Sequence, residues 1–140
     1  MKTIIVFYSY TGRAKALAQA LAAKEPADIM EVKDIRRPGA LKAYTAGCFA
    51  SIRGRSWPVE PLKTNLKAYS RIVLFSPVWA GNTPPAVNSL LEKLPGGKAV
   101  AVKMVSASGK SGCKGRITAV LKAKKCTLES YEDLKNSRER

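Results

Sequence analysis

Short runs of aliphatic residues that alternate with helical patterns constrain the fold of this chain most strongly. Residues 3–8, 71–76 and 98–105 are rich in Ile and Val and show no regular alternation of apolar and polar side chains. Such runs are typical of strands buried on both faces, as in a parallel sheet. A weaker run at 29–35 predicts another strand, and residues 126–130 predict a last one.

Helical spacing of apolar residues appears between these runs. Three stretches each place their apolar side chains on one helical face, and a fourth stretch does so more loosely. The sets are Ala14, Leu17, Ala18 and Leu21; Val87, Leu90, Leu91 and Leu94; Ile117, Val120 and Leu121; and, in the looser stretch, Leu41, Tyr44, Cys48, Phe49 and Ile52. The alternation of strand and helix predicts an open α/β sheet with helices on both faces.

Length and composition narrow the class of protein. A chain of 140 residues with 46% hydrophobic content predicts one domain. The first apolar run is too short for a signal peptide or for the ~20 residues of a membrane span, so we expect a cytoplasmic protein without membrane association. The absence of histidine excludes His-ligated metal sites and Ser-His or Cys-His nucleophiles. Three widely spaced cysteines are expected to be reduced.

Positive charge is in large excess. The chain carries 25 Lys and Arg against 10 Asp and Glu, a formal net charge of +15. This excess predicts acidic partners. The basic residues are spread without a long run or interleaved exposed aromatics, so nucleic acid is not the expected partner.

Two turns between an apolar run and a helical pattern predict a ligand site. The sequence SYTG at 9–12 places hydroxyl groups and a glycine at a helix start, where backbone N–H groups and the helix dipole attract a phosphate. The alternative interpretation is an ordinary helix cap. In the sequence PVWAGN at 77–82, Trp79 offers a surface on which a planar ligand can stack.

In these turns, and in the runs around them, the chain resembles the flavodoxin family over nearly its whole length. The resemblance implies a five-stranded parallel sheet of order 2-1-3-4-5 and a bound flavin mononucleotide, FMN. It implies a phosphate cradle, a loop against the flavin ring that includes the stacking Trp79, and a second ring loop. These are Ser9, Tyr10, Thr11, Gly12, Arg13 and Ala14; Pro77, Val78, Trp79, Ala80, Gly81 and Asn82; and Ser106, Ala107, Ser108, Gly109 and Gly112.

The chain departs from the family pattern in three respects. Arg13 and Ala14 stand where the family has a small polar residue followed by Thr or Ser, and the chain is basic where the family's carriers are acidic. The sequence after residue 130 is too short and polar for the usual last helix. We therefore expect a domain at 1–130, a polar tail at 131–140, a shortened or missing C-terminal helix, and an open apolar patch beside the first helix that favours a homodimer.

The leading hypothesis is an FMN-binding electron carrier between redox partner proteins, with acidic partners expected, no catalytic side chain and no metal. One alternative is a small NAD(P)H-dependent flavin or quinone reductase. Another is a flavin-free basic module that binds an acidic protein or nucleic acid. A phosphorylation receiver is rejected, because the first strand ends in Tyr8 and Ser9 rather than an acidic cluster.

Overall fold

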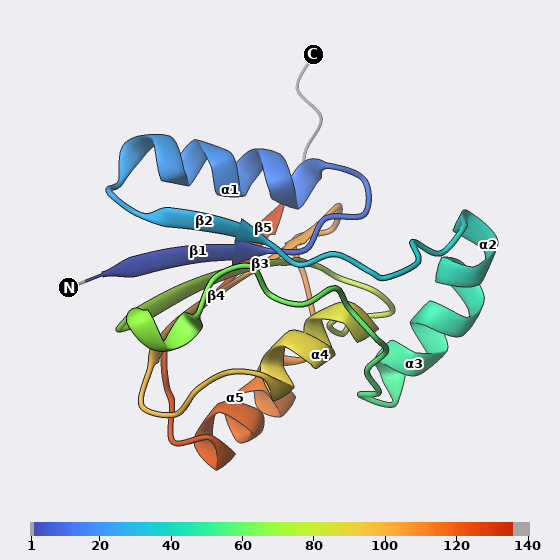
Figure 1. Ribbon diagram of the computed structural model, residues 1–140. Helices are drawn as coiled ribbons and strands as arrows, with labels where there is room; N and C mark the ends of the chain where they lie inside the picture. Colours follow the sequence, from blue (N-terminus) through green and yellow to red (C-terminus); the bar gives the residue numbers. More distant parts are fainter. Residues whose placement is uncertain (1, 136–140) are drawn as a thin grey trace.

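The computed structural model describes residues 2–135, which form one five-stranded parallel sheet with helices on both faces (Figure 1). The strand order is β2-β1-β3-β4-β5, and every neighbouring pair is parallel. The strands are β1 (Thr3–Phe7), β2 (Asp28–Glu31), β3 (Arg71–Pro77), β4 (Ala99–Ser106) and β5 (Thr127–Lys135). The predicted fold class and strand order are confirmed.

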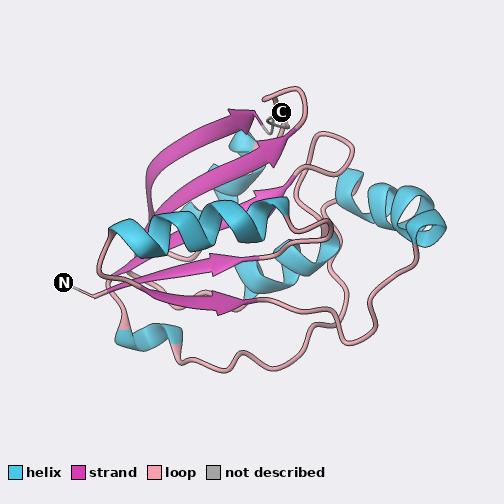
Figure 2. Cartoon of the chain, turned by 90° about the horizontal axis from the view of Figure 1, so that it is seen from above, coloured by secondary structure: helices cyan, strands magenta, loops and turns pink. Residues whose placement is uncertain are grey.

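The helices form two layers and one projecting segment. Helix α1 (Arg13–Lys24) covers one face of the sheet, and α4 (Pro85–Glu92) and α5 (Lys114–Ala123) cover the other (Figure 1). A continuous segment of α2 (Ala40–Lys42), the π-helical η1 (Ala43–Gly47) and α3 (Cys48–Ile52) projects beyond the carboxyl ends of the strands (Figures 1 and 2). A short 3-10 turn, η2 (Leu66–Ala68), precedes β3.

Both faces of the central strands are buried, which explains the unbroken apolar runs. Ile5 and Val73 lie under α1, and Ala14 and Ala18 let this helix approach the sheet closely. On the other face, Ile4, Val6, Ile72 and Leu74 pack with Leu90 of α4 and with Ile117 and Leu121 of α5. Helix α4 is buried along almost its entire length, from Pro85 to Leu91.

Strand β2 ends earlier than the predicted strand at 29–35. After Glu31 the chain leaves the sheet, and Asp34 forms an antiparallel bridge with Val59 instead. The carboxylate of Asp34 accepts hydrogen bonds from the Tyr8 hydroxyl at 2.6 Å and the Trp57 indole N–H at 3.0 Å. These contacts hold the chain away from the sheet edge.

The looser helical pattern at 41–52 is a helix, but its large apolar residues do not form the buried face. The buried side consists of Ala43, Gly47 and Ser51, spaced four residues apart. Leu41, Tyr44, Phe49 and Ile52 are 53–79% exposed. Small residues are required because a Cβ atom on Gly47 would lie 2.6 Å from Cζ3 of Trp79.

Strand β5 corrects the predicted boundary at residue 130. It continues through Tyr131 and Leu134 to Lys135, paired with β4. The described residues contain no helix after β5, and the rest of the predicted tail, 136–140, lies outside them. Pairing with β4 satisfies the backbone N–H and C=O groups on one side of this edge strand, so the segment is held in the sheet without a helical structure.

The predicted open apolar patch beside α1 is wrong. On that face, β3 and β4 present Arg71 and Lys103, which pair with Glu129 and Glu132 of β5. The Arg71–Glu129 contact is bidentate, with Nε–Oε1 and Nη2–Oε2 distances of 2.8 Å. Ion pairs thus stand on this face of β3, β4 and β5. The homodimer stays a prediction.

Candidate functional site

A groove of about 200 Å³ lies at the carboxyl ends of β1, β3 and β4. It is lined by Ser9, Tyr10, Thr11, Arg13, Ala14, Pro77, Val78, Trp79, Val105, Ser106 and Ala107. These residues follow three strands, and the chain connections from β1 and β3 diverge to opposite sides at this point. Open α/β sheets bind their ligands at such a switch in strand order.

The first wall is the turn between β1 and α1. The hydroxyl oxygen of Ser9 accepts a hydrogen bond from the Gly12 N–H at 2.9 Å, which closes the turn. Gly12 has φ +98°, a left-handed conformation that favours glycine, and a Cβ there would meet nothing within 4 Å. The backbone is therefore open toward solvent at the start of α1.

The electrostatics of this turn suit an anion. Helix α1 has 12 residues and no acidic residue in its first turn. Its dipole and its first N–H groups are positive at this end. Arg13 lines the groove, and Ser9 and Thr11 carry hydroxyl groups. The donors present fit a phosphate group, because charge-assisted hydrogen bonds from Arg can replace the hydroxyl that Ala14 lacks.

The second wall is a tight turn after β3. The backbone N–H of Trp79 donates to the Asn82 carbonyl at 2.8 Å, and the Asn82 N–H donates back to the Trp79 carbonyl at 2.9 Å. The two central residues, Ala80 and Gly81, have φ +51° and +79°. Two positive φ angles define a type I′ turn, which places Trp79 at the groove.

Trp79 is held by an aromatic cluster. Its ring makes edge contacts with Tyr8, Tyr10 and Trp57 at centroid distances of 6.2, 5.6 and 6.4 Å. Tyr10 is fixed in turn by its hydroxyl, which donates to the Pro38 carbonyl at 2.8 Å. Burial, followed by the hydrogen bond to Asp34, raises the pKa of Tyr8 well above its ordinary value. Tyr8 therefore acts as a neutral hydrogen-bond donor.

The third wall is the loop after β4. The Ser106 hydroxyl accepts hydrogen bonds from the N–H groups of Gly109 at 2.9 Å and Lys110 at 3.1 Å. The Gly112 N–H donates to the Gly81 carbonyl at 2.6 Å, which ties the second and third walls together. Ser111 of this loop contacts β5.

Strand β5 supports this loop through a polar cluster. The Ser111 hydroxyl lies 2.5 Å from the Tyr131 hydroxyl and 2.5 Å from Oδ1 of Asp133. Cys113 is fully buried, with Sγ 3.3 Å from the Tyr131 hydroxyl. Burial first, and then this contact, raises the pKa of Tyr131.

The groove brings together most, but not all, of the predicted ligand residues. Those that do not line it are Gly12, Ala80, Gly81, Asn82, Ser108, Gly109 and Gly112, which shape the turns behind the walls. Sequence interpretation missed Val105, the last apolar residue before the third loop. It also missed Tyr131 and Asp133, because the segment that carries them was interpreted as a tail.

Residues 2–135 contain no group of three or more Cys, Asp or Glu side chains arranged to hold a metal ion. No helix within the same residues has the length and apolar character needed to cross a bilayer.

Solved structures of similar shape come from several bacteria. A proposed flavoprotein from Bacteroides eggerthii has a TM-score of 0.80 at 16% identity, over 99% of this chain and 90% of that one. A flavoprotein from Lactobacillus acidophilus, solved in complex with FMN, has a TM-score of 0.73 at 20% identity, over 96% and 93%. A flavodoxin from Streptococcus pneumoniae has a TM-score of 0.58 at 16% identity, over 100% and 88%.

The chain therefore has a flavodoxin-like fold. These structures support the resemblance to flavodoxins that the sequence indicates. No protein-family model matches the sequence, and no curated protein matches it.

Proposed function

We propose that this protein binds FMN in the groove and carries electrons between partner proteins. The observation that supports this most is the meeting of three walls at the switch in strand order: an anion-binding turn, an aromatic side chain and a backbone-rich loop. The FMN complex of the similar Lactobacillus acidophilus flavoprotein adds support.

The turn at Ser9–Gly12 and the start of α1 would hold the phosphate. Arg13 supplies the positive charge, and Thr11, an exposed residue that also lines the groove, carries a hydroxyl group. Gly12 leaves room for a close approach to the backbone. These groups suit a phosphate monoester better than an uncharged ligand, because each of them favours negative charge.

Trp79 and the loop after β4 would hold the flavin ring. Trp79 is kept in place by its aromatic neighbours, and the loop is fixed by Ser106 and by the Gly112–Gly81 hydrogen bond. Bound FMN supplies the electron transfer itself. The side chains of the groove bind and orient the ring, and the positive charge of the chain favours a reduced, anionic flavin.

Titration of the apo protein with FMN and with riboflavin, followed by flavin fluorescence, tests this proposal. We expect saturable quenching, and binding at least tenfold weaker for riboflavin because the phosphate contacts are lost. Arg13→Ala should weaken FMN binding and leave riboflavin binding unchanged. Lys122→Ala, an exposed substitution on α5, removes the same charge elsewhere and is the matched control.

Equal affinities for FMN and riboflavin, or no quenching at tens of micromolar, would refute the phosphate cradle. Rapid oxidation of NADH or NADPH by the FMN-loaded protein would favour the reductase hypothesis over an electron carrier.

A further inference from the structure

The segment at 40–52 exposes large apolar side chains to solvent. Leu41, Tyr44, Phe49 and Ile52 are exposed by 78, 79, 53 and 54%. We call these four residues the apolar strip. Most of the large exposed apolar side chains at 2–135 belong to it. Clusters of this kind on a water-soluble surface commonly mark interaction sites.

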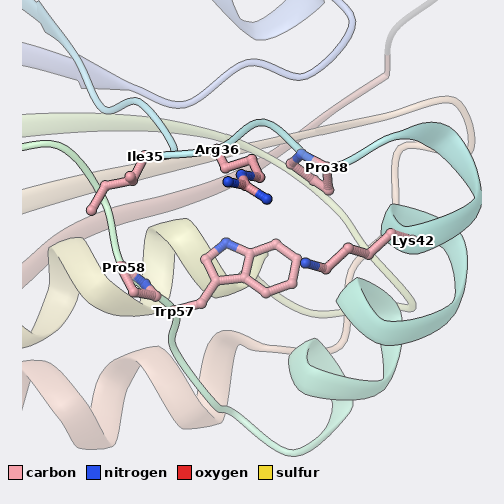
Figure 3. Close-up of a pocket in the computed structure, with 6 residues that line it drawn as sticks. All are labelled: Ile35, Arg36, Pro38, Lys42, Trp57 and Pro58. Atoms are coloured by element: carbon pink, nitrogen blue, oxygen red, sulfur yellow. The ribbon is translucent and has the colours of Figure 1, made fainter.

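A pocket of about 240 Å³ shares this segment, because Lys42, the neighbour of Leu41 in the chain, lines it (Figure 3). Figure 3 shows the indole of Trp57 between Pro58 and the amino group of Lys42, with Arg36 and Pro38 on the opposite side. Ile35, itself 63% exposed, completes the lining. We call this the Trp57 pocket. Its walls are apolar, and two cations stand at its rim.

The Trp57 pocket is rigidly built. The indole N–H donates to Asp34, and the Trp57 carbonyl accepts a hydrogen bond from the Ser89 hydroxyl of α4. The apolar strip is anchored as well, because the Arg116 guanidinium of α5 donates to the carbonyls of Ser51 at 2.7 Å and Ile52 at 2.8 Å. The surface is therefore formed before any partner arrives.

The charge of the chain segment at 33–55 is strongly one-sided. Between residues 33 and 55 the chain carries six basic residues and a single acidic one, Asp34. The Asp34 carboxylate already accepts hydrogen bonds from Tyr8 and Trp57. The six are Lys33, Arg36, Arg37, Lys42, Arg53 and Arg55. A second copy of this chain would bring like charges together, whereas an acidic partner would be attracted.

We propose that the apolar strip and the Trp57 pocket form the docking surface for an acidic protein partner. An apolar side chain of the partner enters the pocket, and its Asp or Glu residues lie against Arg36 and Lys42. A protein fits better than a membrane, because a bilayer could cover the convex strip but could not fill the concave pocket. This inference rests on the proposed function, because the partner is the one that exchanges electrons with the proposed carrier.

The surface is connected to the groove. Trp57 contacts Trp79 edge to face at 6.4 Å, and Trp79 lines the groove where the flavin ring would lie. A partner docked on Trp57 would therefore stand one aromatic residue away from the cofactor site.

Selection of a random peptide library displayed on phage tests the proposal. The selection is made on the apo protein and again in the presence of saturating FMN, and binding of the synthetic peptides is measured by fluorescence anisotropy. We expect enriched peptides that combine Asp or Glu with Leu, Phe or Trp. Their affinity should fall at least tenfold in a Leu41→Ser/Tyr44→Ser variant and in Lys42→Glu, and should weaken with added salt.

Two matched controls keep the test specific. Ile29→Ser removes an exposed apolar residue from β2, and Lys122→Glu reverses an exposed charge on α5. Neither should change peptide binding. Failure to enrich any peptide, enrichment without acidic residues, or equal binding by all variants would overturn the proposal. Sedimentation with phosphatidylglycerol vesicles that is lost in the Leu41→Ser/Tyr44→Ser variant would overturn it in favour of a membrane.

FMN binding is measured separately on the same samples. A protein that binds the peptides but not FMN keeps this docking surface and refutes the proposed function. A protein that binds FMN but not the peptides keeps the proposed FMN binding and refutes this docking surface.

Discussion

Replacement of Gly47 by alanine tests the packing between the projecting helix and Trp79. A Cβ at this position would lie 2.6 Å from Cζ3 and 3.1 Å from Cε3 of Trp79, and 3.3 Å from Cη2 of Trp57. Ordinary carbon contacts need about 3.6 Å, so the ring or the helix must move by about 1 Å. Such overpacking costs about 1–3 kcal/mol, while alanine in a helix recovers up to about 1 kcal/mol relative to glycine.

Gly47→Ala should therefore lower the free energy of unfolding by about 1 kcal/mol. The matched control is Gly115→Ala in α5, where the new Cβ would meet nothing within 4 Å. That variant should gain about 0.5–1 kcal/mol from helix propensity alone. The two identical substitutions should thus change stability in opposite directions, by a difference of about 2 kcal/mol.

Urea unfolding followed by tryptophan fluorescence measures both variants, and titration with FMN shows the effect on the groove. If Trp79 is pushed toward the groove, FMN binding should weaken about tenfold in Gly47→Ala and stay unchanged in Gly115→Ala. Equal stabilisation by the two substitutions would refute the close packing of Gly47 on Trp79, whatever the outcome for FMN.

Two further predictions concern single side chains. Ser51 is fully buried, and its hydroxyl has no hydrogen-bond partner among residues 2–135. Ser51→Ala should therefore raise the free energy of unfolding by about 1 kcal/mol in urea titrations. A lower free energy of unfolding would show that the hydroxyl does make a hydrogen bond. The Arg71 guanidinium holds the pKa of Glu129 below its ordinary value of about 4.3. This contribution to stability is present above that value and is lost as the pH falls through the lower pKa of the folded state. Glu129→Gln should thus flatten the acid side of the stability profile by at most about 1 kcal/mol, since the pair is partly exposed. An unchanged pH dependence of stability in Glu129→Gln would contradict a stabilising Arg71–Glu129 ion pair.

The sheet could be predicted because its central strands are buried on both faces. A strand such as Arg71–Pro77 then has a continuous apolar sequence, and the strand order follows from the resemblance to a known family. The turns at Ser9–Gly12 and Trp79–Asn82 could be predicted as parts of a site because each comes directly after such a strand. Local sequence was sufficient for the strands and the turns, whereas the strand order needed the family resemblance.

The segment at 40–52 shows where local sequence is insufficient. Helical spacing of large apolar residues normally indicates a buried face. Here tertiary contacts decide which side faces the protein, and the contact of Gly47 with the Trp79 ring requires a small residue. The pattern alone does not contain the position of Trp79, which lies more than thirty residues further along the chain.

The end of the chain shows a second limit. Tyr131–Lys135 is polar and lacks a strand-like alternation, yet it pairs with β4 through its backbone. One of its charged side chains, Glu132, pairs with Lys103 of β4. Glu129, two residues before the segment, pairs with Arg71 of β3. Sequence inspection treats such residues as solvated, because the partners are distant in the chain.

The hydrogen bond from the Gly112 N–H to the Gly81 carbonyl has a consequence for how this site can vary. Substitutions in the loop at 77–82 and in the loop at 106–112 act on one joined structure, so their effects on ligand affinity should be non-additive. A change in either loop is tolerated or rejected according to the residues in the other. Variation in the two loops is therefore expected to be correlated, and engineering of one should begin by screening both together.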